Sequence, residues 1–106
     1  MNALTLVHNA IKAYVGEGGV CIDATAGRGY DTAFLCELVG KNGSVTAFDV
    51  QQDAIDSTKN LLESKGLCAR LVLDSHANMA NYLDEESVDC IVFNLGYLPK
   101  GDHSVY

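Results

Sequence analysis

Apolar residues follow two different spacings along this chain, and the two spacings alternate. Recurrence at every third or fourth position predicts helices at about residues 4–14, 30–39 and 53–65, and a weaker helical turn at 78–83. Short unbroken apolar runs, typical of strands buried on both faces, occupy residues 19–23, 44–48, 70–73 and 88–93. The first helix would carry its apolar face on Leu4, Val7, Ile11 and Tyr14. Strands that alternate with helices predict an α/β fold, with a doubly wound parallel sheet and helices on both of its faces.

Composition excludes several classes of protein. The 106 residues fit one domain, and no apolar stretch approaches the roughly 20 residues that a membrane helix needs. The N-terminus lacks the basic start and long apolar block of a signal peptide. The formal net charge of −7 argues against a broad nonspecific nucleic-acid surface. Separate cysteines in apolar segments predict buried thiols and a cytoplasmic location; they are Cys21, Cys36, Cys68 and Cys90.

Each predicted strand leads into a polar residue. In chain order these residues are Asp23, Asp49, Asp74 and Asn94. Ligands of open α/β sheets bind beyond the carboxyl ends of the strands, so the four residues mark a candidate binding site. No second pair of metal ligands with the usual spacing accompanies them, and we predict no metal site.

The first strand end opens the loop "DATAGRGYDT", residues 23–32. Gly27 and Gly29 would let the backbone approach a ligand closely, although a glycine pair also occurs in ordinary strand-to-helix turns. Asp49 follows Gly29 by about 20 residues, the distance at which nucleoside sites place a carboxylate for the ribose hydroxyls. The two features together favour a ligand that contains a nucleoside.

The same loop discriminates between nucleoside cofactors. A pyrophosphate cofactor such as NAD needs bare backbone amides at a helix start, but Asp31 lies just inside this helix and would repel a phosphate. S-adenosylmethionine (AdoMet) fits better, because a carboxylate near the loop can pair with the ammonium group of its amino-acid tail. Asp74 would then accept a hydrogen bond from the adenine amino group, although a surface carboxylate at a helix start is an equal alternative. An NAD-type oxidoreductase fragment and a noncatalytic AdoMet-binding or interaction module stay open as alternative functions.

The fourth strand leads into "FNLGYLPKGD", residues 93–102. Asn94 and a nearby backbone carbonyl can both accept from an N–H2 group, which would aim the nitrogen lone pair at the methyl group to be transferred. Tyr97 offers an aromatic face to a cation, and Gly96 keeps the backbone open. The alternative is an ordinary bend at a strand end. We predict that the catalytic residues are Asn94, Leu95, Gly96 and Tyr97.

In this order, "DATAGRGYDT", "AFDVQ", "LDSH" and "FNLGYLPKGD" resemble the class I AdoMet-dependent methyltransferases, and among them the small bacterial rRNA methylases. The resemblance implies an RNA substrate, either rRNA or the aminomethyl group of the tRNA wobble uridine (mnm5s2U). It departs from the general class at Thr25, where the first loop glycine is expected. The cofactor contacts that it implies involve Asp23, Thr25, Ala26, Gly27, Gly29, Asp31, Thr32, Asp49, Val50, Gln51, Asp74, Ser75, His76 and Asn94.

The resemblance also implies that residues 1–106 are the N-terminal, AdoMet-binding part of one larger domain. Such domains have seven strands, of which this chain would supply four in the order 3-2-1-4, without the C-terminal strands. The fourth strand would then be an open edge, which soluble proteins avoid. We therefore expect a fragment that is inactive alone, or an edge covered by a partner chain, as in a homodimer.

Overall fold

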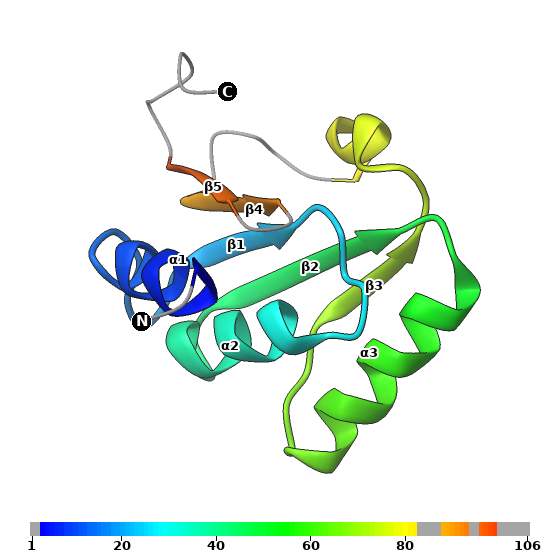
Figure 1. The fold of residues 1–106 in the computed structure, drawn as a ribbon, viewed down its shortest axis with the longest axis horizontal. Coiled ribbons are helices and arrows are strands. Elements are labelled where there is room, and N and C mark those ends of the chain that lie inside the picture. The colour runs from blue at the N-terminus through cyan, green and yellow to red at the C-terminus, as the bar shows by residue number, and fades with distance from the viewer. Residues whose placement is uncertain (1–2, 83–87, 94–95, 100–106) are drawn as a thin grey trace.

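Strands and helices alternate along the chain until the last two strands, which follow each other directly. A computed structural model describes residues 3–82, 88–93 and 96–99. Figure 1 shows its elements, which are α1 (Ala3–Lys12), β1 (Val20–Asp23), α2 (Tyr30–Val39), β2 (Ser44–Asp49), α3 (Gln52–Ser64), β3 (Arg70–Leu73), the 3₁₀-helix η1 (His76–Asn81), β4 (Cys90–Phe93) and β5 (Gly96–Pro99). No helix in these ranges is long and apolar enough to cross a membrane.

The sheet has the order β3-β2-β1-β4-β5, and its first four strands are parallel. The predicted α/β class and the predicted order 3-2-1-4 are confirmed. In the register of the sheet Asp23 lies opposite Ala47 and Val92, and Asp49 lies opposite Leu73. The carboxyl ends of four strands therefore meet along one edge, and β2 extends two residues beyond the end of β1.

The predicted open edge at the fourth strand is wrong. β5 turns back and pairs with β4 in antiparallel register, from Phe93 opposite Gly96 to Cys90 opposite Pro99. The backbone groups of β4 thus gain partners from the same chain, which removes the need for a partner chain at this strand. Glycine and proline made "GYLP" an unpromising strand by propensity, but both residue types are tolerated at a sheet edge.

Apolar side chains pack on both faces of the sheet. On the face toward the viewer in Figure 1, α1, α2 and α3 cover a cluster of Ile11, Val15, Cys21, Ala33, Leu35, Cys36, Val39, Val45, Leu62, Cys90 and Val92. On the opposite face Met79 and Tyr82, in and just after η1, pack against Ile22, Phe48, Val72 and Val88. Two consecutive right-handed crossovers run in one direction from β1 to β3, so both of their helices lie on one face.

Three side chains differ from their predicted environments. Tyr14 is 62% exposed, because α1 ends at Lys12 and the helical spacing from the buried Ile11 no longer applies. Cys68 is exposed, in contrast to the other three cysteines, because it lies in the connection that precedes β3. Leu73 is 52% exposed, because β3 is an edge strand with a buried residue only at Val72.

Gly29, directly before α2, lies in close contact with α3. Its φ angle is +92°, in the left-handed region, and it forms the N-terminal cap of α2. A Cβ atom at this position would lie 2.8 Å from the Cα atom of the buried Thr58 in α3. Both the backbone conformation and the helix contact therefore require glycine.

Gly29→Ala is expected to lower the free energy of unfolding by about 3 kcal/mol, from the left-handed backbone together with overpacking. The matched control is Gly66→Ala, since Gly66 also has a positive φ, +69°, but a Cβ there would meet no atom within 4 Å. The control should lose only about 1 kcal/mol. Urea denaturation of the two variants measures the difference, and equal losses would contradict a tight contact between α2 and α3.

Candidate functional site

Asp23 ends the central strand β1, and its carboxylate is buried, with 1% of the residue exposed. One oxygen, Oδ1, accepts from the backbone N–H of Thr25 at 3.1 Å. The other, Oδ2, accepts from the hydroxyl of Thr32 in α2 at 2.6 Å. Asp23 therefore ties the start of the glycine loop to the first turn of the helix that follows it. Its own side chain does not reach the surface.

The glycine loop is also fastened to the next strand end. Asp49 accepts from the backbone N–H of Gly27 at 3.0 Å and from that of Gln51 at 2.9 Å. The backbone N–H of Ala26 donates to the carbonyl of Phe48 at 2.8 Å. A carboxylate offers about four acceptor positions, so the half-buried Asp49 keeps capacity for hydroxyl donors from a ligand.

Asp31 lies in the first turn of α2, where it has a partner that the sequence did not indicate. Its Oδ1 lies 2.8 Å from Nε2 of His8 in α1. The His8 ring stacks flat on the ring of Phe34, with centroids 3.8 Å apart and an angle of 2° between the planes. No local spacing in the sequence connects His8 with Asp31, which lies 23 positions later.

Asp74, directly after β3, is the centre of a polar network. It accepts from the backbone N–H of Ser75 at 2.7 Å, from the amide of Asn78 at 2.9 Å and from the hydroxyl of Tyr82 at 2.7 Å. The hydrogen bond from Asn78, followed by those from Tyr82 and Ser75, lowers the pKa of Asp74, so it is a carboxylate at neutral pH. The same bond to Asp74 raises the pKa of Tyr82. About one acceptor position of Asp74 remains for the predicted adenine contact.

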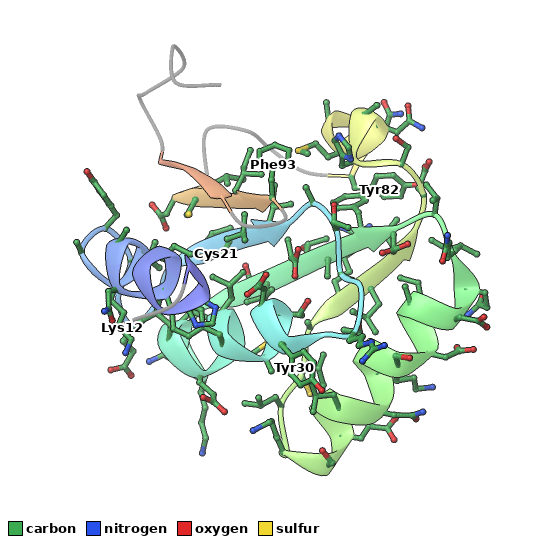
Figure 2. All side chains as sticks on the ribbon, viewed as in Figure 1. Lys12, Cys21, Tyr30, Tyr82 and Phe93 are labelled. Carbon is green, nitrogen blue, oxygen red and sulfur yellow. The ribbon has the colours of Figure 1, made fainter. Side chains whose placement is uncertain are left out.

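The 3₁₀-helix η1, which follows β3, contacts the carboxyl end of β4. His76 in η1 is exposed, and its ring meets the ring of Phe93 edge-on, with centroids 5.8 Å apart. Figure 2 shows Phe93 and Tyr82 near this edge of the sheet. Of the predicted catalytic residues, Asn94 and Leu95 lie outside the described residues. Gly96 pairs with Phe93 at the strand end, and Tyr97 pairs one step back, with Val92.

The remaining predicted contact residues divide into buried and exposed groups. Thr32 and Ala26 are buried, and the Thr32 hydroxyl is engaged by Asp23. Thr25 and Gln51 are exposed, whereas Ser75 is half-buried and its Oγ caps η1 by accepting from the N–H of Ala77. The cofactor contacts predicted for these residues stay predictions.

Large apolar residues are exposed at the same edge of the sheet. Val50, directly after Asp49, is 67% exposed, and Leu73, opposite Asp49 in the register, is 52% exposed. Tyr30, at the start of α2, is also exposed, at 62%, but Figure 2 shows it beside α2 and α3, away from Phe93 and Tyr82. Val50 was predicted in the site, but Leu73 and Tyr30 were not. Exposed apolar side chains beside carboxylates suit a ligand that has both a flat apolar part and polar groups.

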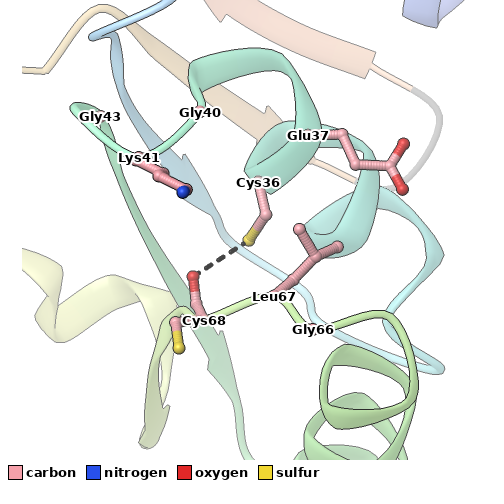
Figure 3. A pocket seen from close by; sticks show the side chains of 8 residues that line it. All are labelled: Cys36, Glu37, Gly40, Lys41, Gly43, Gly66, Leu67 and Cys68. Atoms are coloured by element: carbon pink, nitrogen blue, oxygen red, sulfur yellow. Dashed lines mark hydrogen bonds between the residues drawn. The ribbon is translucent and has the colours of Figure 1, made fainter.

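A hollow of about 450 Å³ lies at the opposite end of the sheet (Figure 3). Its lining includes Lys41 and Gly43, just before β2, and Leu67 and Cys68, just before β3. These residues precede the amino ends of the strands, far along the sheet from Asp49 and its neighbours. Ligands of parallel α/β sheets bind at the carboxyl ends, so we assign the site from the strand ends and not from this hollow.

The strand order, the glycine loop after β1 and the carboxylates after β2 and β3 define a Rossmann-like fold of the class I methyltransferase type. A solved structure from Clostridium thermocellum, described as a "putative rRNA-methylase", is 48% identical and covers 99% of this chain and 57% of its own, with a TM-score of 0.85. A Streptococcus mutans structure, described as a "putative methyltransferase" in complex with SAH, is 36% identical over 97% of this chain and 57% of its own, with a TM-score of 0.80.

Residues 45–106 match the model of the family described as "Putative rRNA methylase", and the chain belongs to this family. The resemblance inferred from the four sequence motifs is thereby confirmed. The chloroplastic tRNA (mnm(5)s(2)U34)-methyltransferase of Arabidopsis thaliana is 35% identical over 97% of this chain. This chain spans 42% of the length of that relative and 57% of each of the two solved chains.

The buried carboxyl of Asp23 should make the protein less stable as the pH rises. Burial, and to a lesser degree the negative charges of Asp31 and Asp49, raises the pKa of Asp23 to about 7. The unfolded chain has the ordinary pKa of 3.8, so between these values the folded chain holds a proton that the unfolded chain lacks. The contribution of Asp23 to the free energy of unfolding should fall by about 2–3 kcal/mol between about pH 5 and about pH 8.

Urea denaturation across this pH range, on the unaltered chain and on Asp23→Asn, isolates the effect. The amide of the variant does not titrate, so the difference between the two curves is the contribution of the carboxyl. A difference that does not change with pH would mean that Asp23 is ionised throughout.

Proposed function

We propose that this chain is the AdoMet-binding part of an RNA methyltransferase, with residues 1–106 forming the N-terminal portion of one domain. The reaction is transfer of a methyl group to the nitrogen of an aminomethyl group on the tRNA wobble uridine, or to a base of rRNA. The observation that carries the proposal is the group of three carboxylates around the glycine loop, Asp23, Asp31 and Asp49. Membership of the rRNA methylase family supports it.

The residues of this site fit AdoMet better than they fit a dinucleotide. Asp31 and Asp49 bring negative charge beside the loop, which favours a ligand with a cationic tail and disfavours a pyrophosphate. Asp49 retains acceptor positions for ribose hydroxyls, and the exposed Val50 and Leu73 offer apolar surface to an adenine ring. The S. mutans relative was solved with SAH, the demethylated form of this cofactor, which agrees with the fit.

The residues of this chain act by orienting the reactants. When bound, AdoMet supplies an electrophilic methyl group on a sulfonium. Asn94 would accept from the amine N–H2 and aim the nitrogen lone pair along the line of transfer, and such positioning supplies much of the rate enhancement. β5 begins at Gly96, which pairs with Phe93 at the carboxyl end of β4.

Similarity to two groups of proteins supports RNA as the proposed substrate. The family is described as an rRNA methylase, and the Arabidopsis relative carries the name of a tRNA mnm5s2U34 methyltransferase. We favour the tRNA aminomethyl group, because an amide acceptor at Asn94 suits an amine with two N–H bonds. With a formal net charge of −7, this part of the protein does not supply a broad basic RNA-binding surface.

Calorimetric titration is expected to give binding of AdoMet and SAH and no binding of NAD. Asp49→Asn should weaken AdoMet binding by about 1–3 kcal/mol, because the ribose hydroxyls lose a charged acceptor. Asp53→Asn, an exposed carboxylate in the first turn of α3, is the matched control and should change binding by less than about 0.5 kcal/mol. Binding of NAD without AdoMet would reject the proposal in favour of an oxidoreductase.

Asn94→Ala, introduced into the full-length enzyme, should lower turnover about 100-fold while AdoMet affinity changes little, because Asn94 would orient the amine and not the cofactor. Undermodified tRNA and labelled AdoMet provide the assay, with rRNA as the second substrate. The Asp49→Asn enzyme should instead lose AdoMet affinity first. If the two variants lose turnover and affinity in the same proportion, the division of roles between them is wrong.

A further inference from the structure

His8 is held by two residues of α2 at the same time. Its Nε2 lies 2.8 Å from the Asp31 carboxylate, and its ring face lies flat on Phe34, three residues further along α2. Lys12, four residues after His8 in α1, brings its Nζ within 5.9 Å of the centre of the same Phe34 ring. The imidazole thus has little freedom to rotate, since one edge and one face are both occupied.

Asp31 is the carboxylate that this arrangement fixes. It belongs to the first turn of α2, two residues after the cap Gly29, and its side chain is 24% exposed. Unlike Asp23, it therefore has access to a ligand at the glycine loop. The bond to His8 involves Oδ1, and a carboxylate offers about four acceptor positions, so Asp31 can also bind an ammonium group.

A bond from a histidine differs from a bond to a lysine or arginine in its effect on charge. A neutral imidazole donates one N–H and holds the carboxylate in place without cancelling its negative charge. A fixed carboxylate loses less side-chain freedom when it binds a cation, and this preorganisation favours affinity.

We propose that His8 is a positioning residue that holds Asp31 toward the ammonium group of the AdoMet tail. This inference rests on the proposed function and adds to it a selectivity determinant in α1, outside the strand ends. Its consequence is specific, because His8 contributes to binding of ligands with the amino-acid tail and not to binding of the adenosine part.

The test compares AdoMet with 5′-methylthioadenosine, which has the adenosine and sulfur but lacks the amino-acid tail. His8→Phe keeps a flat ring against Phe34 and loses the N–H. Its dissociation constant for AdoMet should rise about tenfold, the size of one hydrogen bond to a charged group, as measured by calorimetry. Its dissociation constant for methylthioadenosine should change less than about twofold. His8→Gln, whose amide can donate to Asp31, should recover most of the lost AdoMet affinity.

A second test asks whether the effects of substitutions at His8 and Asp31 on AdoMet affinity are additive. Asp31→Asn still accepts from His8 but lacks the charge, so it should lose AdoMet affinity selectively. Adding His8→Phe to Asp31→Asn should then cause little further loss, because the two residues act through one contact. Fully additive losses would overturn the positioning role.

An NMR measurement on the unaltered chain keeps the inference testable if His8→Phe does not fold. The chain has three histidines, and His76→Gln and His103→Gln variants identify the resonances of His8 by elimination. AdoMet should shift the Nε2 resonance of His8, and methylthioadenosine should leave it in place.

The outcomes separate this inference from the proposed function. Equal weakening of both ligands in His8→Phe, or no weakening of either, would reject the positioning role while AdoMet binding by the unaltered chain stands. If the unaltered chain binds neither ligand, both the proposed function and the inference fail.

Discussion

The burial of the Asp23 carboxylate is the constraint from which the site is built. β1 lies between β2 and β4, so the residue that ends it is enclosed by neighbours on both sides. A buried carboxylate needs hydrogen-bond donors, and the chain supplies them from Thr25 and Thr32, two and nine residues later. To satisfy both bonds, the segment between them must turn sharply at one place, and that turn is the glycine loop.

The burial of Asp23 also makes the stability of the fold depend on the charges of the neighbouring carboxylates. Two further carboxylates, Asp31 and Asp49, raise the pKa of Asp23 through their negative charges, after the larger effect of burial. Carboxylates that repel one another in this way are an unfavourable arrangement for an empty site and a favourable one for a bound cation. Hydrogen bonds from the backbone N–H groups of Gly27 and Gln51 hold Asp49, and the bond to the His8 ring holds Asp31. This arrangement lowers the stability of the fold. Such a loss is typical of a binding site rather than of a group of residues that only packs.

The spacing of apolar residues and the positions of glycines along the sequence were enough to predict individual helices and strands. The α2 helix occupies the predicted residues 30–39, because apolar spacing and the glycines at both ends coincide there. The parallel sheet followed from the alternation of strands and helices, whereas its order 3-2-1-4 came from the resemblance to class I methyltransferases. Contacts between segments that are distant in the sequence could not be predicted from these spacings. The bond from His8 to Asp31, the return of β5 onto β4 and the exposure of Leu73 each depend on which segments become neighbours in the fold.

The three aspartates at the strand ends differ in how much of their acceptor capacity the protein itself uses. Asp23 is enclosed and can act on a ligand only through its charge. Asp74 accepts three internal bonds, which hold η1 in place and leave about one position. Asp49 accepts two, both from backbone N–H groups, and it lies at the end of β2, two residues beyond the end of β1. The remaining capacity is therefore largest where the ribose hydroxyls are proposed to bind. The role that we propose for Asp74 is mainly to shape the loop beside the adenine.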